Sequence, residues 1–71
     1  MASYTAIIRR TPKWWVGWIE EIPGVNCQGK TRKDLVENLR SALTEMLELN
    51  RAEAKAAAGE GFEEEVITLP A

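Results

Sequence analysis

The sequence predicts an α+β domain of order β-β-β-α-β, in which an antiparallel-rich sheet carries one helix on one face. Short runs rich in β-branched and aromatic residues, separated by proline and glycine, predict the strands. A helical repeat of apolar residues after Gly29 predicts the helix. We expect residues 1–71 to form one domain, which buries only about 60% of its unfolded surface at this size. A domain so small often depends on a partner or an oligomer.

The first two strands are expected at residues 3–10 and 14–20, joined as a hairpin by the polar connection 11–13. Successive strand side chains alternate between faces. Trp15, Gly17 and Ile19 therefore share one face, and Trp14, Val16 and Trp18 share the other. Both faces are apolar, and a single helix covers only one of them. Something else must cover the second face or an edge.

Pro23 and Gly24 are expected to end the second strand and turn the chain, since proline fixes φ and glycine tolerates a positive φ. Residues 25–28 form a short third strand, followed by Gly29. Thr31 is the expected N-cap of the helix, with Asp34 three residues later in a capping-box-like relation. These residues are interpreted as structural.

The helix has a broad apolar stripe on one side. The stripe consists of Leu35, Leu39, Ala42, Met46 and Leu49, with Val36, Leu43 and Leu47 beside it. Beyond Asn50 the alanine-rich run to Ala58 has high helix propensity but no large apolar side chains. Whether the helix continues past Asn50 is left open; Gly59 would stop it. Residues 65–69, EVITL, are expected to form the last strand.

Composition argues against several functions. Nine basic and eleven acidic residues give a net charge of −2, which disfavours non-specific binding of nucleic acid. The single cysteine, Cys27, has no disulfide partner in the chain, and no apolar run approaches the ~20 residues that span a bilayer. A soluble cytoplasmic protein is expected. With no histidine and only one aspartate, Asp34, neither catalysis nor a metal or other cofactor is expected.

The candidate partner-binding or oligomer-interface residues are aromatic, acidic or apolar groups on the predicted strands and their ends. They are Trp14, Trp15, Trp18, Glu20, Glu21 and Ile67. For any single tryptophan, core filling is the simpler interpretation, but three in five positions cannot all point inward. The carboxylates suit a solvated loop, and they could also steer a basic partner. A small basic cluster of Arg9, Arg10 and Lys13 lies at the hairpin.

The order YTAIIRR, WWVGWIEEIPGVNCQGKT, an amphipathic helix and EEEVITL resembles the HicB family of antitoxins over nearly the whole chain. The most specific part is the aromatic strand followed by IPGV, two residues and QGKT. The family typically shows a PGC-x-x-x-G-x-(S/T) pattern there. Val25 stands where the family most often has cysteine, and Cys27 is displaced.

This resemblance implies a truncated ribonuclease-H-like fold and a protein that binds and masks a small basic HicA-type mRNA-cleaving toxin. Longer family members carry a C-terminal DNA-binding module; the chain ends after the last predicted strand, so direct DNA binding by this chain alone is not expected. A homodimer or homotetramer is also expected. The alternative is a homo-oligomeric binding or structural domain of the same fold without a toxin partner.

Overall fold

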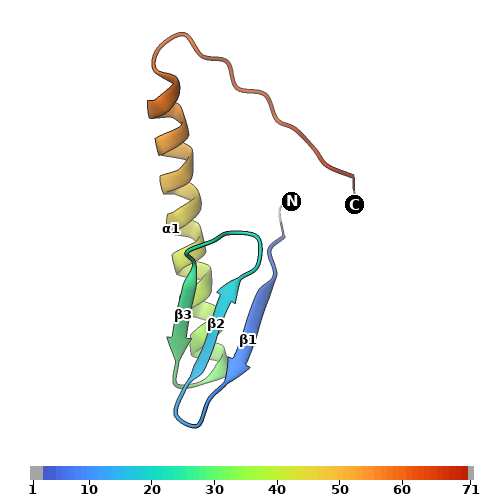
Figure 1. Cartoon of the computed structure of the whole chain (residues 1–71), viewed down its shortest axis with the longest axis vertical. Coiled ribbons are helices and arrows are strands. Elements are labelled where there is room, and N and C mark those ends of the chain that lie inside the picture. The colour runs from blue at the N-terminus through green and yellow to red at the C-terminus, as the bar shows by residue number, and fades with distance from the viewer. Residues whose placement is uncertain (1–2, 71) are drawn as a thin grey trace.

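The structure, a computed structural model, describes residues 3–70 and contains three strands followed by one long helix. The elements are β1 (Ala6–Arg10), β2 (Trp15–Ile19), β3 (Asn26–Gly29) and α1 (Arg32–Ala58). Residues 1, 2 and 71 of the predicted domain lie outside the described residues. The α+β arrangement of three strands and a helix is confirmed (Figure 1).

The three strands form an antiparallel sheet in the order β1-β2-β3, so β2 lies in the centre. A tight turn joins β1 to β2. In this turn the backbone N–H of Thr11 donates to the carbonyl of Trp14 at 2.8 Å. The Thr11 hydroxyl in turn accepts the Trp14 N–H at 3.0 Å. These local bonds explain why a polar connection with a proline closes the hairpin.

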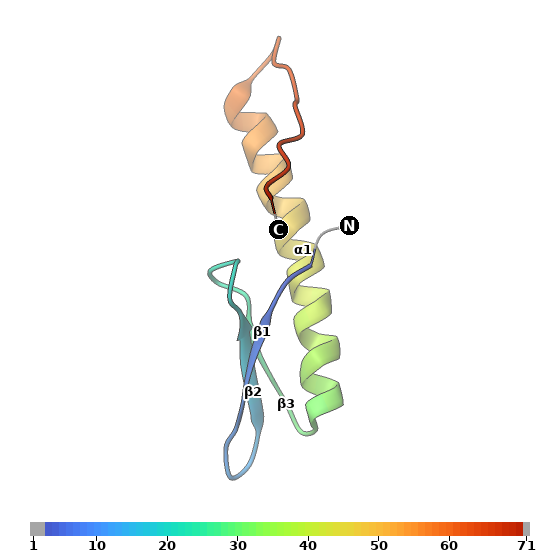
Figure 2. The same ribbon diagram turned by 90° about the vertical axis from the view of Figure 1, so that its right-hand side faces the viewer.

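Helix α1 packs on one face of this sheet only, as the edge-on view in Figure 2 shows. The buried core consists of Ile19, Val25, Leu35 and Leu39. Ala6, Ile8, Trp15, Cys27 and the helix residues Ala42, Leu43 and Met46 pack around it. The side chains that face the helix therefore come from alternate strand positions, as the period of two requires.

The first turn of α1 is closed by its cap. Thr31 is extended, with φ −125° and ψ 163°, and its hydroxyl accepts the backbone N–H of Asp34 at 3.0 Å. This bond satisfies one of the N–H groups that have no partner within the helix. Asp34 also places a negative charge at the positive end of the helix dipole.

Substituting Thr31→Ala should lower the free energy of unfolding by about 1 kcal/mol, because the Asp34 N–H loses its acceptor. Urea denaturation followed by circular dichroism measures this loss. Thr44→Ala is the matched control, since the Thr44 hydroxyl only donates back to the Arg40 carbonyl of the preceding turn. If both variants unfold at the same urea concentration, the capping bond contributes nothing.

The helix is much longer than the sheet that it covers. Its 27 residues extend about 40 Å, whereas a five-residue strand extends about 17 Å. The helix continues through the alanine-rich run and ends at Gly59, where φ is 75° and the N–H bonds to the Lys55 carbonyl at 3.3 Å. Leu49 is 51% exposed because it lies beyond the sheet. The last turns of α1 form an overhang, here defined as residues 50–58.

The predicted fourth strand, residues 65–69, is not formed: the segment is drawn out as an extended trace in Figure 1 but pairs with no strand. Val66, Ile67 and Leu69 are 92%, 78% and 80% exposed. In Figure 1 this segment descends from the top of α1, separated from the helix and from the sheet. The expectation was wrong because a strand needs an edge to pair with, and the overhang places the start of the segment away from the sheet of its own chain.

Candidate functional site: the outer face of the sheet

The face of the sheet opposite α1 has no covering element among residues 3–70 (Figure 2). Its side chains are those of Ile7, Arg9, Val16, Trp18, Asn26 and Gln28, which the register brings together as opposed pairs. Trp18 lies opposite both Ile7 and Asn26. We call this surface the outer face.

Gly17 explains why Trp18 points outward. An ideal Cβ on Gly17 would lie 3.2 Å from Leu35 Cδ2 and 3.4 Å from Leu39 Cδ1, so this position faces the helix. Its neighbour Trp18 must then face away from the helix. The Trp18 side chain is 44% exposed, and that of Ile7 is 36% exposed. Beside Trp18 lies a shallow depression of about 360 Å³ between β2 and β3.

The other two tryptophans lie elsewhere. Trp15 is half-buried on the helix side, and the guanidinium carbon of Arg10 lies 5.5 Å from the centroid of its ring. This distance allows a cation–π interaction. Trp14 is half-buried in the hairpin turn. Only Trp18 therefore contributes to the outer face with a largely accessible ring.

Glu20 and Glu21 follow the far end of β2, away from the hairpin turn. The Glu20 N–H donates to the Thr5 carbonyl at 2.9 Å, and the Glu21 Oε1 accepts the Thr5 N–H at 2.7 Å. The bond from the Thr5 backbone lowers the pKa of Glu21, because it stabilises the carboxylate. Glu21 is thus held as an anion at the edge of the outer face. Ile67, in contrast, lies on the unpaired C-terminal segment.

The turn and cap residues have structural positions. Gly24 adopts a φ of 89°, which requires glycine in the turn after Pro23. Gly29 is buried where β3 meets the start of α1, and an ideal Cβ there would lie 2.6 Å from the backbone nitrogen of Leu35. Neither glycine presents a side chain to a partner.

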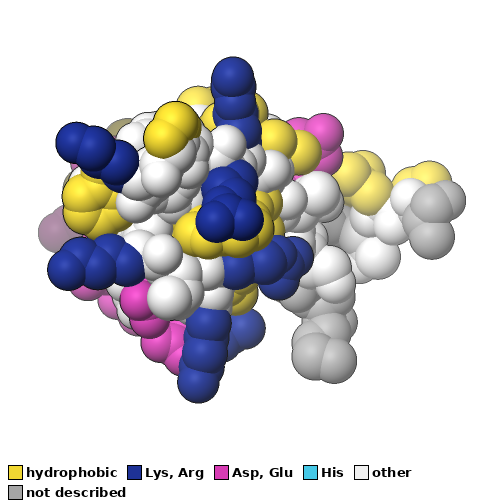
Figure 3. Space-filling model, turned by 90° about the horizontal axis from the view of Figure 1, so that it is seen from below, with side chains coloured by type: hydrophobic (Ala, Val, Ile, Leu, Met, Phe, Trp, Pro, Cys, Tyr) yellow, Lys and Arg dark blue, Asp and Glu magenta, His cyan; other side chains and the backbone are white. Residues whose placement is uncertain are grey.

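The structure adds one feature to the basic cluster at the hairpin. Figure 3, the view from below, shows Lys and Arg side chains around this end of the molecule. Lys30 joins Arg10 and Lys13 around a small cavity of about 50 Å³. The neighbouring position Gly29 pairs with Trp15, so the end of β3 lies beside the start of β2. Sequence reasoning missed Lys30 because only strand pairing brings it to the hairpin.

Metal ligands and the single thiol were the remaining candidates for reactive groups. Among residues 3–70, no three His, Cys, Asp or Glu side chains come together as a metal site. Cys27 is half-buried on the helix side, and burial raises the pKa of its thiol, which keeps it protonated. Within the same residues, α1 lacks the continuous apolar stretch that would be needed to cross a bilayer.

Comparisons with family models, with curated proteins and with solved structures found no match to this chain.

Proposed function

We propose that this chain is a cytoplasmic, antitoxin-like protein that binds a small basic HicA-type mRNA-cleaving toxin and neutralises it by masking. The observation that carries the proposal is the uncovered outer face with the exposed ring of Trp18 at its centre. The sequence pattern that resembles the HicB family supplies the class of partner. Masking requires only a binding surface and no catalytic group, which agrees with the chemistry of the outer face.

The composition of the outer face suits a protein partner. A fully buried tryptophan buries 150–250 Å², and Trp18 is 44% exposed, so covering its remaining surface would contribute about 2–3 kcal/mol at 25 cal/mol per Å². Ile7 and Val16 extend the apolar centre, and polar side chains of Arg9, Asn26 and Gln28 surround it. An aromatic anchor within a polar rim is the arrangement typical of interface hot spots.

Charge also favours a basic partner. The chain carries a net charge of −2, and Glu20 and Glu21 lie at one end of the outer face. Opposite charges on two proteins raise the rate of encounter and help to fix their orientation. The basic cluster at the hairpin lies at the other end, so the surface is polarised along β2. A basic toxin would approach from the carboxylate end.

Substituting Trp18→Ala should weaken binding of the HicA-type toxin by at least about 2 kcal/mol, roughly a thirtyfold rise in Kd. Titration calorimetry gives the affinity, and an mRNA-cleavage assay shows whether inhibition is lost. Phe62→Ala is the matched control, because Phe62 has the same 44% exposure but lies beyond the helix, away from the outer face.

Binding that is equally weakened by both substitutions would contradict the placement of the site on the outer face. Toxin cleavage that continues in molar excess of the unmodified chain would contradict the function itself. Circular dichroism must show that Trp18→Ala keeps its helix content, since the ring lies outside the buried core.

The second candidate function is a homo-oligomeric domain, a homodimer or homotetramer, without a toxin partner. The unpaired apolar segment 65–69 favours self-association, because three large apolar side chains there are almost fully exposed. The two functions are compatible, since self-association through this segment leaves the outer face accessible. A neighbouring reading frame that encodes a short basic protein would favour the antitoxin function.

A further inference from the structure

We infer that residues 65–69 of one chain add as a strand to the open edge of β1 in a second copy of the chain. This inference deepens the self-association proposed above and rests on it. The exchange would supply the fourth strand that the single chain lacks. Each copy would both donate its segment and accept that of its partner.

The donor segment has the properties of a strand without a sheet. Its sequence, EVITL, contains three β-branched residues, and its backbone is extended. Alternation places Ile67 and Leu69 on one side and Val66 and Thr68 on the other. Ile67 and Leu69, which are 78% and 80% exposed in the single chain, can therefore enter the same groove.

The acceptor is the free edge of β1. Thr5 bonds through its carbonyl to the N–H of Glu20, on the β2 side. Because neighbouring residues of an antiparallel strand point their backbone groups to opposite sides, Ala6 and Ile8 direct theirs to the open edge. These unpaired groups form a template for another strand.

The β3 edge is a poorer acceptor. The outward carbonyl of Gln28 already accepts the side-chain amide of Asn38 at 3.0 Å. The start of α1 lies close to the same strand, since the backbone of Leu35 approaches within 2.6 Å of an ideal Cβ on Gly29. The β1 edge is therefore the available one.

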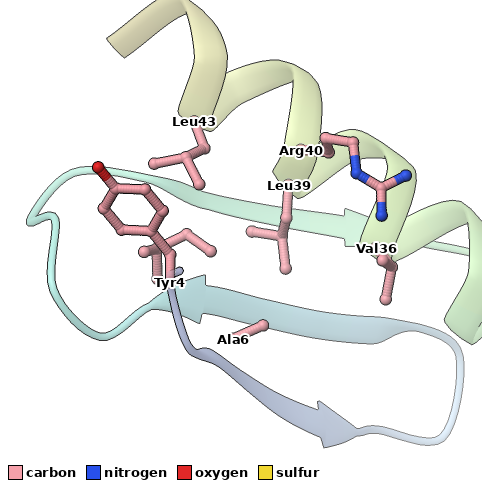
Figure 4. A pocket seen from close by; sticks show the side chains of 7 residues that line it. Tyr4, Ala6, Val36, Leu39, Arg40 and Leu43 are labelled. Carbon is pink, nitrogen blue, oxygen red and sulfur yellow. The ribbon is translucent and has the colours of Figure 1, made fainter. Parts of the chain in front are cut away.

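A groove beside β1 would receive the side chains of the added strand. It has a volume of about 190 Å³ and lies between the start of β1 and the N-terminal half of α1 (Figure 4). Its lining consists of Tyr4, Ala6, Ile19, Val36, Leu39, Arg40 and Leu43. Ile67 or Leu69 would enter its apolar part, and Glu65, on the same side of the segment, would approach the Arg40 guanidinium.

The overhang favours a second copy over the same chain. Lys55 Nζ lies 3.5 Å from Glu64 Oε1, so the segment begins beside the last turns of α1. From Lys55 back to Leu43, which lines the groove, the helix extends about 18 Å. Residues 65–69 extend only about 17 Å and would end where β1 begins. They therefore end before they can lie along β1 of their own chain, and a partner's β1 can meet them instead.

The mass in solution tests this inference. The unmodified chain should have twice the mass of one chain by light scattering, and I67D/L69D should have half of that value. Thr68→Asp is the matched control, because it adds a charge to the opposite side of the segment and should keep the doubled mass. These positions lie outside the buried core, so folding is retained.

Disulfide crosslinking then identifies which chain pairs with which. In a Cys27→Ala background, one chain carries Thr68→Cys and another carries Thr5→Cys, Ile7→Cys or Arg9→Cys. A disulfide between the two different chains for at least one pair is the expected result. No mixed dimer for any pair would overturn the exchange. If the I67D/L69D variant keeps the doubled mass, the chain self-associates but not by this exchange. If the unmodified chain is monomeric, both the exchange and the self-association are contradicted.

Discussion

Substituting Leu35→Ala is expected to lower the free energy of unfolding by about 2–5 kcal/mol. Leu35 has no exposed surface, and it contacts the sheet directly above Gly17. Truncation removes its apolar contacts and leaves a cavity that the helix and sheet cannot close. A domain of this size has a total stability of about 4–11 kcal/mol, so the variant should be partly unfolded at physiological temperature.

Thermal unfolding followed by circular dichroism measures this effect. Leu49→Ala is the control, because Leu49 belongs to the same apolar stripe but is 51% exposed beyond the sheet. Its loss should change the stability by less than about 1 kcal/mol. Equal destabilisation by the two substitutions would mean that the sheet covers the helix further toward its C-terminus than the structure shows.

Substituting Gly29→Ala is expected to lower the free energy of unfolding by about 1–3 kcal/mol or more. Leu35→Ala removes atoms from the core, whereas Gly29→Ala adds an atom where there is no space. The added Cβ would lie 2.6 Å from the backbone nitrogen of Leu35 and 3.1 Å from the carbonyl carbon of Asp34. Both atoms belong to the first turn of α1, which cannot move without breaking the cap at Thr31. The helix would have to move away from β3.

Gln28→Ala is the control, because Gln28 is exposed on the neighbouring position and uses its backbone carbonyl, not its side chain, to bind Asn38. Urea denaturation of both variants shows whether a loss of stability comes from the close approach of Gly29 to α1 or from a general change in strand propensity. A Gly29→Ala protein as stable as the unmodified chain would show that β3 and α1 are further apart than described.

The faces of β2 could be predicted from the sequence, because a period of two assigns Trp15 and Trp18 to opposite sides without further information. The same holds for the N-cap at Thr31, which depends on residues three apart. The sequence left the end of α1 open between Asn50 and Ala58, because the alanine-rich run favours a helix by propensity but lacks the large apolar side chains that would pack on a sheet. In the overhang, the helix is maintained by the intrinsic helix propensity of its residues and not by packing on the sheet.

Features that depend on contacts between residues far apart in the sequence could not be predicted from the sequence. Residues 65–69 have the composition of a strand, but composition does not supply the edge with which a strand must pair. Gly29 was interpreted as a structural turn residue, but its close approach to the backbone of Leu35 exists because β3 and α1 pack closely. Arg10 stacks on Trp15 because the register sets these residues opposite each other.

The central claim is that the ring of Trp18 is accessible in the free chain and covered by a toxin partner. Nuclear magnetic resonance measures this directly, because the three tryptophans give three indole N–H signals. A soluble paramagnetic probe should broaden the Trp18 signal strongly in the free chain, and a bound HicA-type toxin should protect it. A Trp18 signal that is shielded in the free chain, or equally broadened with the toxin bound, would contradict the account.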